Sequence, residues 1–99
     1  MTPEKQIQND ILNYLKHLKQ SFEPIFYERR QAGGFSYKKG IPDIYCVYYG
    51  IHIEIEVKKP GGQLSTMQEK FRDMCETNNI KWICVDDVEQ LKTYLDSIK

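Results

Sequence analysis

The stretch that decides the fold of this chain is a strictly alternating run of apolar and polar residues, Ile51-His52-Ile53-Glu54-Ile55-Glu56-Val57-Lys58. Because successive side chains of a β-strand point to opposite faces of a sheet, the aliphatic residues share one face and the polar residues share the other. The aliphatic face is expected to pack against helices. The polar face has two interpretations, a half-exposed strand with a solvated charged surface or a strand that carries a site.

A second strand is expected directly before this run, at residues 43–49, with Gly50 as the tight turn of a β-hairpin. In a simple hairpin with this turn, Asp43 and Glu56 lie opposite each other. Neighbouring carboxylates repel each other unless a cation lies between them, and such oxygen ligands suit Mg²⁺ or Mn²⁺. Lys58 shares a face with Glu56, where an ammonium group orients a metal-bound water or stabilises charge on a phosphate.

The remaining elements follow from periodicity and from capping residues. The expected elements are a helix at about 3–20, strands at 25–30, 43–49 and 51–58, a helix from Ser65 to about Thr77, a strand at 80–85 and a last helix that begins at a capping pair, Asp86 with Glu89. The order α-β-β-β-α-β-α predicts an α/β fold in which helices flank a sheet.

The composition sets limits on the class of protein. The chain has 99 residues with 14 Lys+Arg and 14 Asp+Glu, which predicts a single domain over residues 1–99 and argues against disorder. Zero net charge excludes a strongly basic coating, although it permits a local positive surface. The sequence has neither a membrane-spanning run nor a secretory segment, so a cytoplasmic location is expected. The three cysteines lack CxxC spacing and are expected to be core or near-core thiols.

These residues together resemble the signature of the PD-(D/E)xK nuclease superfamily, and the fuller pattern resembles its VRR-NUC branch, in particular the stand-alone, phage-type members. The residues that carry the resemblance are Gly40-Ile41-Pro42-Asp43, Glu54-Ile55-Glu56-Val57-Lys58-Lys59-Pro60-Gly61, and Leu64-Ser65 with Gln68. The similarity runs from the helix with Glu4 to the strand at 80–85. It implies a restriction-endonuclease-like αβββαβ core with a central mixed sheet and a C-terminal helix.

The resemblance assigns roles to individual residues. Asp43 and Glu56 match the two acids that hold Mg²⁺ or Mn²⁺ in the family, and the backbone carbonyl of Val57 matches a further ligand. Lys58 matches the catalytic lysine. With these roles, the metal lowers the pKa of a bound water and Lys58 positions that water for in-line attack on a phosphodiester.

Other candidate residues have alternative explanations. Glu4 matches an acid that completes the site through metal or water, although an acid in a first helical turn is also favourable to the helix dipole. Gln68 matches a catalytic glutamine, although a capping box explains it equally well. Glu54 is expected to be a solvent-exposed or supporting residue. His52 is a weaker candidate for a catalytic or ligand role.

Basic and aromatic residues surround a glycine-rich loop that leads into Pro42-Asp43. The residues expected to contact nucleic acid are Arg29, Arg30, Tyr37, Lys38, Lys39 and Lys59. Glycines allow a backbone to approach phosphates, and aromatic rings stack on unpaired bases. The alternative is a solvated loop with ordinary basic residues.

The sequence therefore predicts a metal-dependent DNA endonuclease, selective for branched DNA such as Holliday junctions or flaps. The resemblance implies a homodimer, for which Tyr45, Tyr48 and Tyr49 are candidate interface residues with core packing as the alternative, and a bacterial host cell if the chain is phage-encoded. The alternative functions are a catalytically weak nucleic-acid-binding module with a nuclease fold and a small protein-interaction domain.

Overall fold

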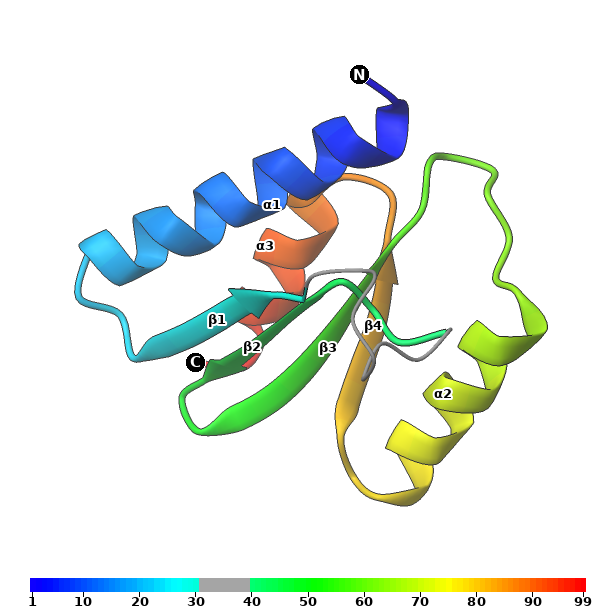
Figure 1. Cartoon of the computed structure of the whole chain (residues 1–99). Helices are drawn as coiled ribbons and strands as arrows, with labels where there is room; N and C mark the ends of the chain where they lie inside the picture. The colour runs from blue at the N-terminus through cyan, green and yellow to red at the C-terminus, as the bar shows by residue number, and fades with distance from the viewer. Residues whose placement is uncertain (31–39) are drawn as a thin grey trace.

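The computed structural model describes residues 1–30 and 40–99, and its elements follow the order that the sequence predicts (Figure 1). The helices are α1 (Pro3–Gln20), α2 (Thr66–Thr77) and α3 (Val88–Asp96), and the strands are β1 (Ile25–Arg29), β2 (Ile44–Tyr48), β3 (Ile51–Val57) and β4 (Lys81–Val85). The strand ends differ from the predicted ends by no more than a single residue. The predicted α/β class is confirmed.

The strands of the described residues form a mixed sheet in the order β1-β2-β3-β4. β2 is antiparallel to both of its neighbours, and β4 is parallel to β3, to which α2 connects it. Tyr49 and Gly50 make the hairpin turn between β2 and β3 with φ values of 50° and 77°. Positive φ at both turn residues gives a backbone twist that matches the twist of the two strands. The predicted hairpin and the predicted mixed sheet are therefore confirmed.

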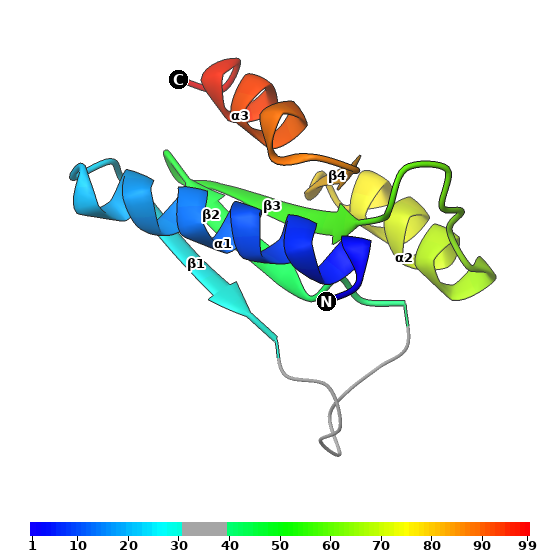
Figure 2. The ribbon, with the colours of Figure 1, turned by 90° about the horizontal axis from the view of Figure 1, so that it is seen from above.

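The hydrophobic core lies between the sheet and the pair of helices α1 and α3, whose positions Figure 2 shows from above. Its fully buried members include Ile11 and Leu15 of α1, Leu91 and Leu95 of α3, and Ile44, Ile53 and Ile55 of the hairpin. Burial of each aliphatic side chain of this size contributes about 1.5–3 kcal/mol. The aliphatic face of β3 packs as predicted.

The polar face of β3 is not the solvated charged surface that one of the two interpretations of the sequence predicts. Glu54 is 2% exposed and Glu56 is 7% exposed, so this part of the strand is not a solvated surface. α2 packs beside β4, apart from α1 and α3 (Figure 2). Its buried Cys75 lies close enough to Glu54 for that carboxylate to raise the pKa of the thiol, after the larger effect of burial. The alternating pattern of β3 by itself does not predict that α2, a helix later in the chain, packs near its polar face.

The start of α3 corrects the predicted capping pair. Asp87 is the N-cap, and its side chain accepts a hydrogen bond of 2.9 Å from the backbone N–H of Gln90. The Gln90 side chain accepts in turn from the backbone N–H of Asp86, at 2.8 Å. The chain is still extended at Asp87, with φ −156° and ψ 165°, so the helix begins later than the pair Asp86 with Glu89 requires.

All three cysteines are free thiols, as the spacing predicts. Cys46 and Cys75 are buried, whereas Cys84 is exposed, which corrects the prediction of a core or near-core position for that residue. In the part of the chain that the structure describes, no helix is long and apolar enough to cross a membrane.

Candidate active site

Asp43 and Glu56 lie opposite each other at the end of the hairpin that is remote from its turn. The register pairs Ile44 with Ile55. Asp43 directly precedes Ile44 and Glu56 directly follows Ile55, so the next position along the same register places the two acids across from each other. This is the arrangement that the hairpin predicts.

Glu56 is the most perturbed acid of the site. Its Oε1 atom is buried and has no hydrogen-bond partner among the described residues. Burial raises the pKa of Glu56 from 4.5 to about 7, the positive charge of Lys58 opposes this shift, and the carboxylates of Asp43 and Glu4 add to it. Charges act on a carboxylate in this way only from nearby, so four of the predicted residues share one locality. A buried oxygen without a partner costs about 1–3 kcal/mol, which favours binding of a cation.

Asp43 is supported from α1. The Nε2 atom of Gln8 donates a hydrogen bond of 3.2 Å to Oδ2 of Asp43, which fixes one oxygen of this carboxylate. Gln8 lies one helical turn after Glu4, so both side chains lie on the same face of α1. Gln8 was not among the predicted site residues. Its spacing from Glu4 is the signal that points to it, once α1 is known to pass the end of the hairpin.

Gly40 brings the segment before Asp43 against the start of α2. A Cβ atom at this position would lie 2.5 Å from the backbone oxygen of Met67, and the φ of Gly40 is +89°. Both observations require glycine, because other residues adopt this conformation with strain and the added carbon has no room. The close approach joins the Gly40–Asp43 segment to the turn that carries Ser65 and Gln68.

Gln68 forms the predicted capping box of α2. The backbone N–H of Ser65 donates to Oε1 of Gln68 at 2.8 Å, and the backbone N–H of Gln68 donates to Oγ of Ser65 at 3.2 Å. This explains the Ser65–Gln68 pattern by helix capping. A catalytic role of Gln68 stays a prediction.

Lys58 follows directly after β3, and its backbone is held by a hydrogen bond of 3.0 Å from its N–H to the carbonyl of Val85. Its side chain is half-buried and its charge acts on Glu56, whereas Lys59 is exposed. The geometry is consistent with Lys58 as the lysine of the site. The catalytic role of Lys58 and the ligand role of the Val57 carbonyl stay predictions.

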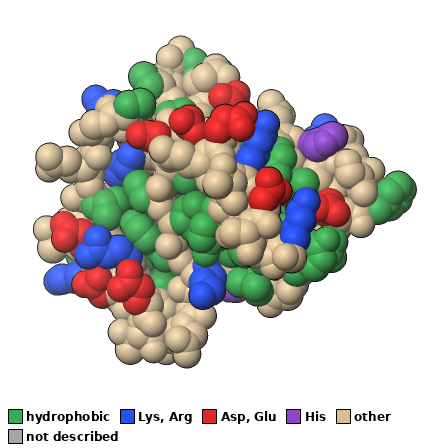
Figure 3. Space-filling model, turned by 180° about the vertical axis from the view of Figure 1, so that it is seen from behind, with side chains coloured by type: hydrophobic (Ala, Val, Ile, Leu, Met, Phe, Trp, Pro, Cys, Tyr) green, Lys and Arg blue, Asp and Glu red, His purple; other side chains and the backbone are tan. Residues whose placement is uncertain are grey.

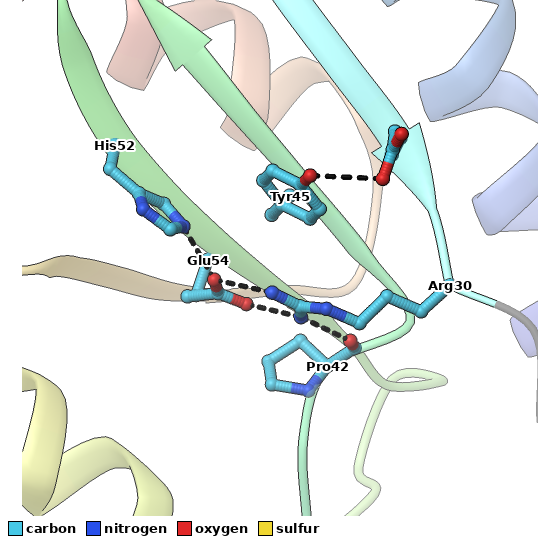
Figure 4. A network of polar contacts seen from close by, with 6 residues as sticks. Arg30, Pro42, Tyr45, His52 and Glu54 are labelled. Atoms are coloured by element: carbon cyan, nitrogen blue, oxygen red, sulfur yellow. Dashed lines mark hydrogen bonds and ion pairs between the residues drawn. The ribbon is translucent and has the colours of Figure 1, made fainter. Parts of the chain in front are cut away.

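Glu54 is a supporting residue rather than a solvent-exposed one. Both of its oxygens accept hydrogen bonds from the guanidinium of Arg30, at 2.6 and 2.8 Å, and Oε2 also contacts Nε2 of His52 at 2.6 Å (Figure 4). Arg30 in addition donates to the carbonyl of Pro42 at 2.8 Å and stacks 4.5 Å from the ring centre of Tyr45. The prediction that Arg30 contacts nucleic acid stays untested, but its guanidinium has these intramolecular partners in the structure.

The other predicted nucleic-acid contacts have mixed outcomes. Arg29 and Lys59 are exposed and accessible to a ligand. Tyr37, Lys38 and Lys39 lie outside the described residues. Figure 3 shows the face turned away from the view of Figure 1, on which acidic and basic side chains both occur and hydrophobic side chains lie between them.

The tyrosines of the hairpin have different environments. Tyr48 is fully buried, and its hydroxyl donates to Glu23 at 2.8 Å, so this residue belongs to the core. Tyr45 donates to Glu28 at 2.9 Å, and Tyr49 is 46% exposed. The core alternative is therefore confirmed for Tyr48, which removes it from the candidate dimer surface.

The carboxylates at this end of the hairpin fit a divalent cation for which the protein supplies only some of the ligands. Among residues 1–30 and 40–99, no three His, Cys, Asp or Glu side chains lie close enough together to hold a metal ion. Mg²⁺ is commonly bound by one or two carboxylates, while waters and substrate phosphates complete its octahedron. The opposed Asp43 and Glu56, with an unpartnered oxygen on Glu56, match this type of site.

Comparison with known proteins supports the fold. No protein-family model matches the sequence, and no curated protein matches it. A solved structure described as "VRR_NUC domain" is similar to 97% of this chain over 97% of its own length, with a TM-score of 0.75 and 14% sequence identity. At this level of identity the similarity establishes the fold. The chain therefore has the fold of a VRR_NUC domain, the fold that its Asp43, Glu56 and Lys58 motif implies.

Proposed function

We propose that this chain is a metal-dependent DNA endonuclease that hydrolyses phosphodiester bonds. The observation that carries the proposal is the buried, unpartnered carboxylate oxygen of Glu56, which lies opposite Asp43 and near Lys58 in a VRR_NUC fold. Buried carboxylates with strongly raised pKa values are typical of functional sites, because burial without a partner costs stability. A purely structural role does not explain why this oxygen lacks a partner.

Asp43 and Glu56 would hold Mg²⁺ or Mn²⁺, with the carbonyl of Val57 as a further ligand and Glu4 acting through a water. Such a cation supplies charge stabilisation at the phosphate and an acidified water. The chain's own residues prepare the site for it. Gln8 fixes one oxygen of Asp43, β-pairing fixes the backbone on both sides of Glu56, and Lys58 supplies an ammonium that orients a nucleophile or stabilises phosphate charge.

The proposed substrate is DNA, with branched forms such as Holliday junctions or flaps favoured. Exposed Arg29 and Lys59 are the described candidates for phosphate contacts. A homodimer would place two such sites on a two-fold-symmetric junction. The alternative function, a nucleic-acid-binding module without turnover, keeps the same contacts and differs only in the absence of cleavage.

Cleavage assays test the proposal. Supercoiled plasmid and a synthetic four-way junction are incubated with the protein in Mg²⁺, in Mn²⁺ and in EDTA. Metal-dependent nicking is expected for wild type, together with a loss of at least about 100-fold for Glu56→Gln and for Lys58→Ala. Exposed residues provide matched controls, Glu76→Gln and Lys16→Ala, which are expected to cleave at the wild-type rate.

Each other outcome has a distinct meaning. Wild-type cleavage by Glu56→Gln refutes the assigned site. Junction binding without cleavage in either metal supports the binding module, and neither binding nor cleavage favours a protein-interaction domain.

A further inference from the structure

Arg30 connects the polar face of β3 to the segment that carries Asp43. Its guanidinium holds both oxygens of Glu54 and also donates to the carbonyl of Pro42. Its backbone N–H donates to the carbonyl of Asp43 at 2.6 Å. Figure 4 shows the guanidinium between Glu54 and Pro42. Arg30 therefore contacts both peptide units that flank the Cα atom of Asp43, through its side chain on one side and its backbone on the other.

We propose that the Arg30–Glu54 pair positions Asp43 for cation binding, so that Arg30 is a positioning residue of the site. The inference rests on the proposed function, in which Asp43 is a metal ligand. Asp43 lies just outside β2, where one backbone hydrogen bond from Arg30 continues the pairing of β1 with β2 by a single position. Its backbone is held by Arg30 and its carboxylate by Gln8.

The geometry requires arginine at this position. The planar guanidinium presents several N–H donors in a rigid fork, which allows two bonds to Glu54 and a third to the Pro42 carbonyl at once. The centre of the Tyr45 ring lies 4.5 Å from the guanidinium carbon, so the ring also packs against this group. A lysine ammonium retains the charge but lacks the fork.

Stability alone is a poor explanation for this ion pair. Glu54 is 2% exposed, and removal of two charges from water offsets much of their attraction, so that well-packed apolar residues often serve equally well. A role in positioning explains the Arg30–Glu54 pair better, because the hydrogen bonds of Arg30 then determine where the Pro42–Asp43 segment lies. Partners that orient a metal ligand commonly account for about 10–100-fold in metal affinity.

The test separates positioning from folding. Arg30→Lys keeps the charge of the pair, and the double variant Arg30→Met with Glu54→Leu removes both charges, so neither leaves a lone buried carboxylate. Glu23→Gln is the matched control, because it removes the negative charge of a carboxylate that binds Tyr48 and Lys99 and that has no bond to Pro42 or Asp43 in the described structure. Mn²⁺ affinity is measured by calorimetry, melting temperature by circular dichroism, and cleavage on the four-way junction. All three measurements are made under conditions in which the variant is folded.

The expected result is Mn²⁺ binding about tenfold weaker or more in Arg30→Lys and in the double variant, with the melting temperature of the double variant close to that of wild type. Cleavage is expected to regain its rate partly at high Mn²⁺. Glu23→Gln is expected to melt earlier with unchanged Mn²⁺ affinity. Unchanged Mn²⁺ affinity in both Arg30 variants overturns the inference. If the wild-type protein cleaves DNA in the same experiment, the proposed function is not affected by that result. A wild-type protein that binds no Mn²⁺ overturns both.

Discussion

Replacement of Glu56 by glutamine should stabilise the metal-free protein at neutral and higher pH. The pKa of Glu56 rises from 4.5 to about 7 on folding, mainly because the carboxylate is buried. Between these values the folded state binds more protons than the unfolded state, so the contribution of Glu56 to the free energy of unfolding falls as pH rises. The contribution of Glu56 to stability is most favourable below its pKa in the unfolded state and is lost once the pH exceeds its pKa in the folded state. Glutamine has no such dependence.

The magnitude follows from the shift. A pKa difference of this size corresponds to at most about 3.5 kcal/mol at about 1.4 kcal/mol per unit, and to about 2 kcal/mol after allowance for solvent screening. The free energy of unfolding of Glu56→Gln relative to wild type is therefore expected to increase by about 2 kcal/mol between about pH 5 and about pH 8. Urea denaturation of both proteins in EDTA measures this difference, in which the titrating groups that do not interact with Glu56 cancel.

A bound cation should reverse the ranking. Saturating Mg²⁺ or Mn²⁺ at about pH 8 stabilises wild type by mass action, since only the folded protein presents the opposed Asp43 and Glu56. The glutamine variant should gain little. If the difference between the two proteins stays constant with pH in EDTA, the carboxylate is not as strongly perturbed as its burial indicates, and the reasoning from the unpartnered oxygen fails.

Two further predictions concern the support of Asp43. Gly40→Ala should lower the free energy of unfolding by about 2–3 kcal/mol, because the new carbon would lie 2.5 Å from the Met67 oxygen. Gly50→Ala is the control and should lower it by about 1 kcal/mol, because Gly50 also has positive φ, at +77°, but has open space around it. Equal losses of the two variants in urea denaturation would contradict this prediction. Gln8→Leu should weaken Mn²⁺ binding about tenfold in calorimetry, because Asp43 loses the hydrogen bond that fixes it. Gln6→Leu, which removes a hydrogen bond to Asp10 on the same helix, is the control, and equal affinities in the two variants would refute the role of Gln8.

Local patterns predict most of the fold. The alternation of residues 51–58, the Gly50 turn and the capping residue Ser65 each specify a backbone conformation, and the structure contains the corresponding elements. The opposition of Asp43 and Glu56 is predictable for the same reason, since the turn determines the register of a hairpin. These features depend on residues that are close in sequence.

Features that depend on distant elements are not predictable in this way. The burial of Glu54 requires Arg30, which directly follows β1, as a partner, and Cys75 of α2 nearby, and neither is visible in the alternation of β3. The role of Gln8 depends on where α1 passes the hairpin. Arg30 is basic and adjacent to a glycine-rich loop, which indicates a nucleic-acid contact until its buried acceptor is known. The sequence shows that these charges exist, and packing decides what each of them binds.

The equal numbers of acidic and basic residues conceal an uneven distribution that bears on mechanism. Lys58 lowers the pKa of Glu56, whereas Asp43 and Glu4 raise it, so three acids and one lysine lie near one another at this end of the hairpin. A phosphodiester that approaches this end without a cation meets repulsion. On the proposed function, the cation that relieves the repulsion between the acids also makes the site attractive to the phosphate. Metal binding and substrate binding are then coupled through one group of charges, so a protein with zero net charge needs no general basic surface to bring a phosphodiester to its site.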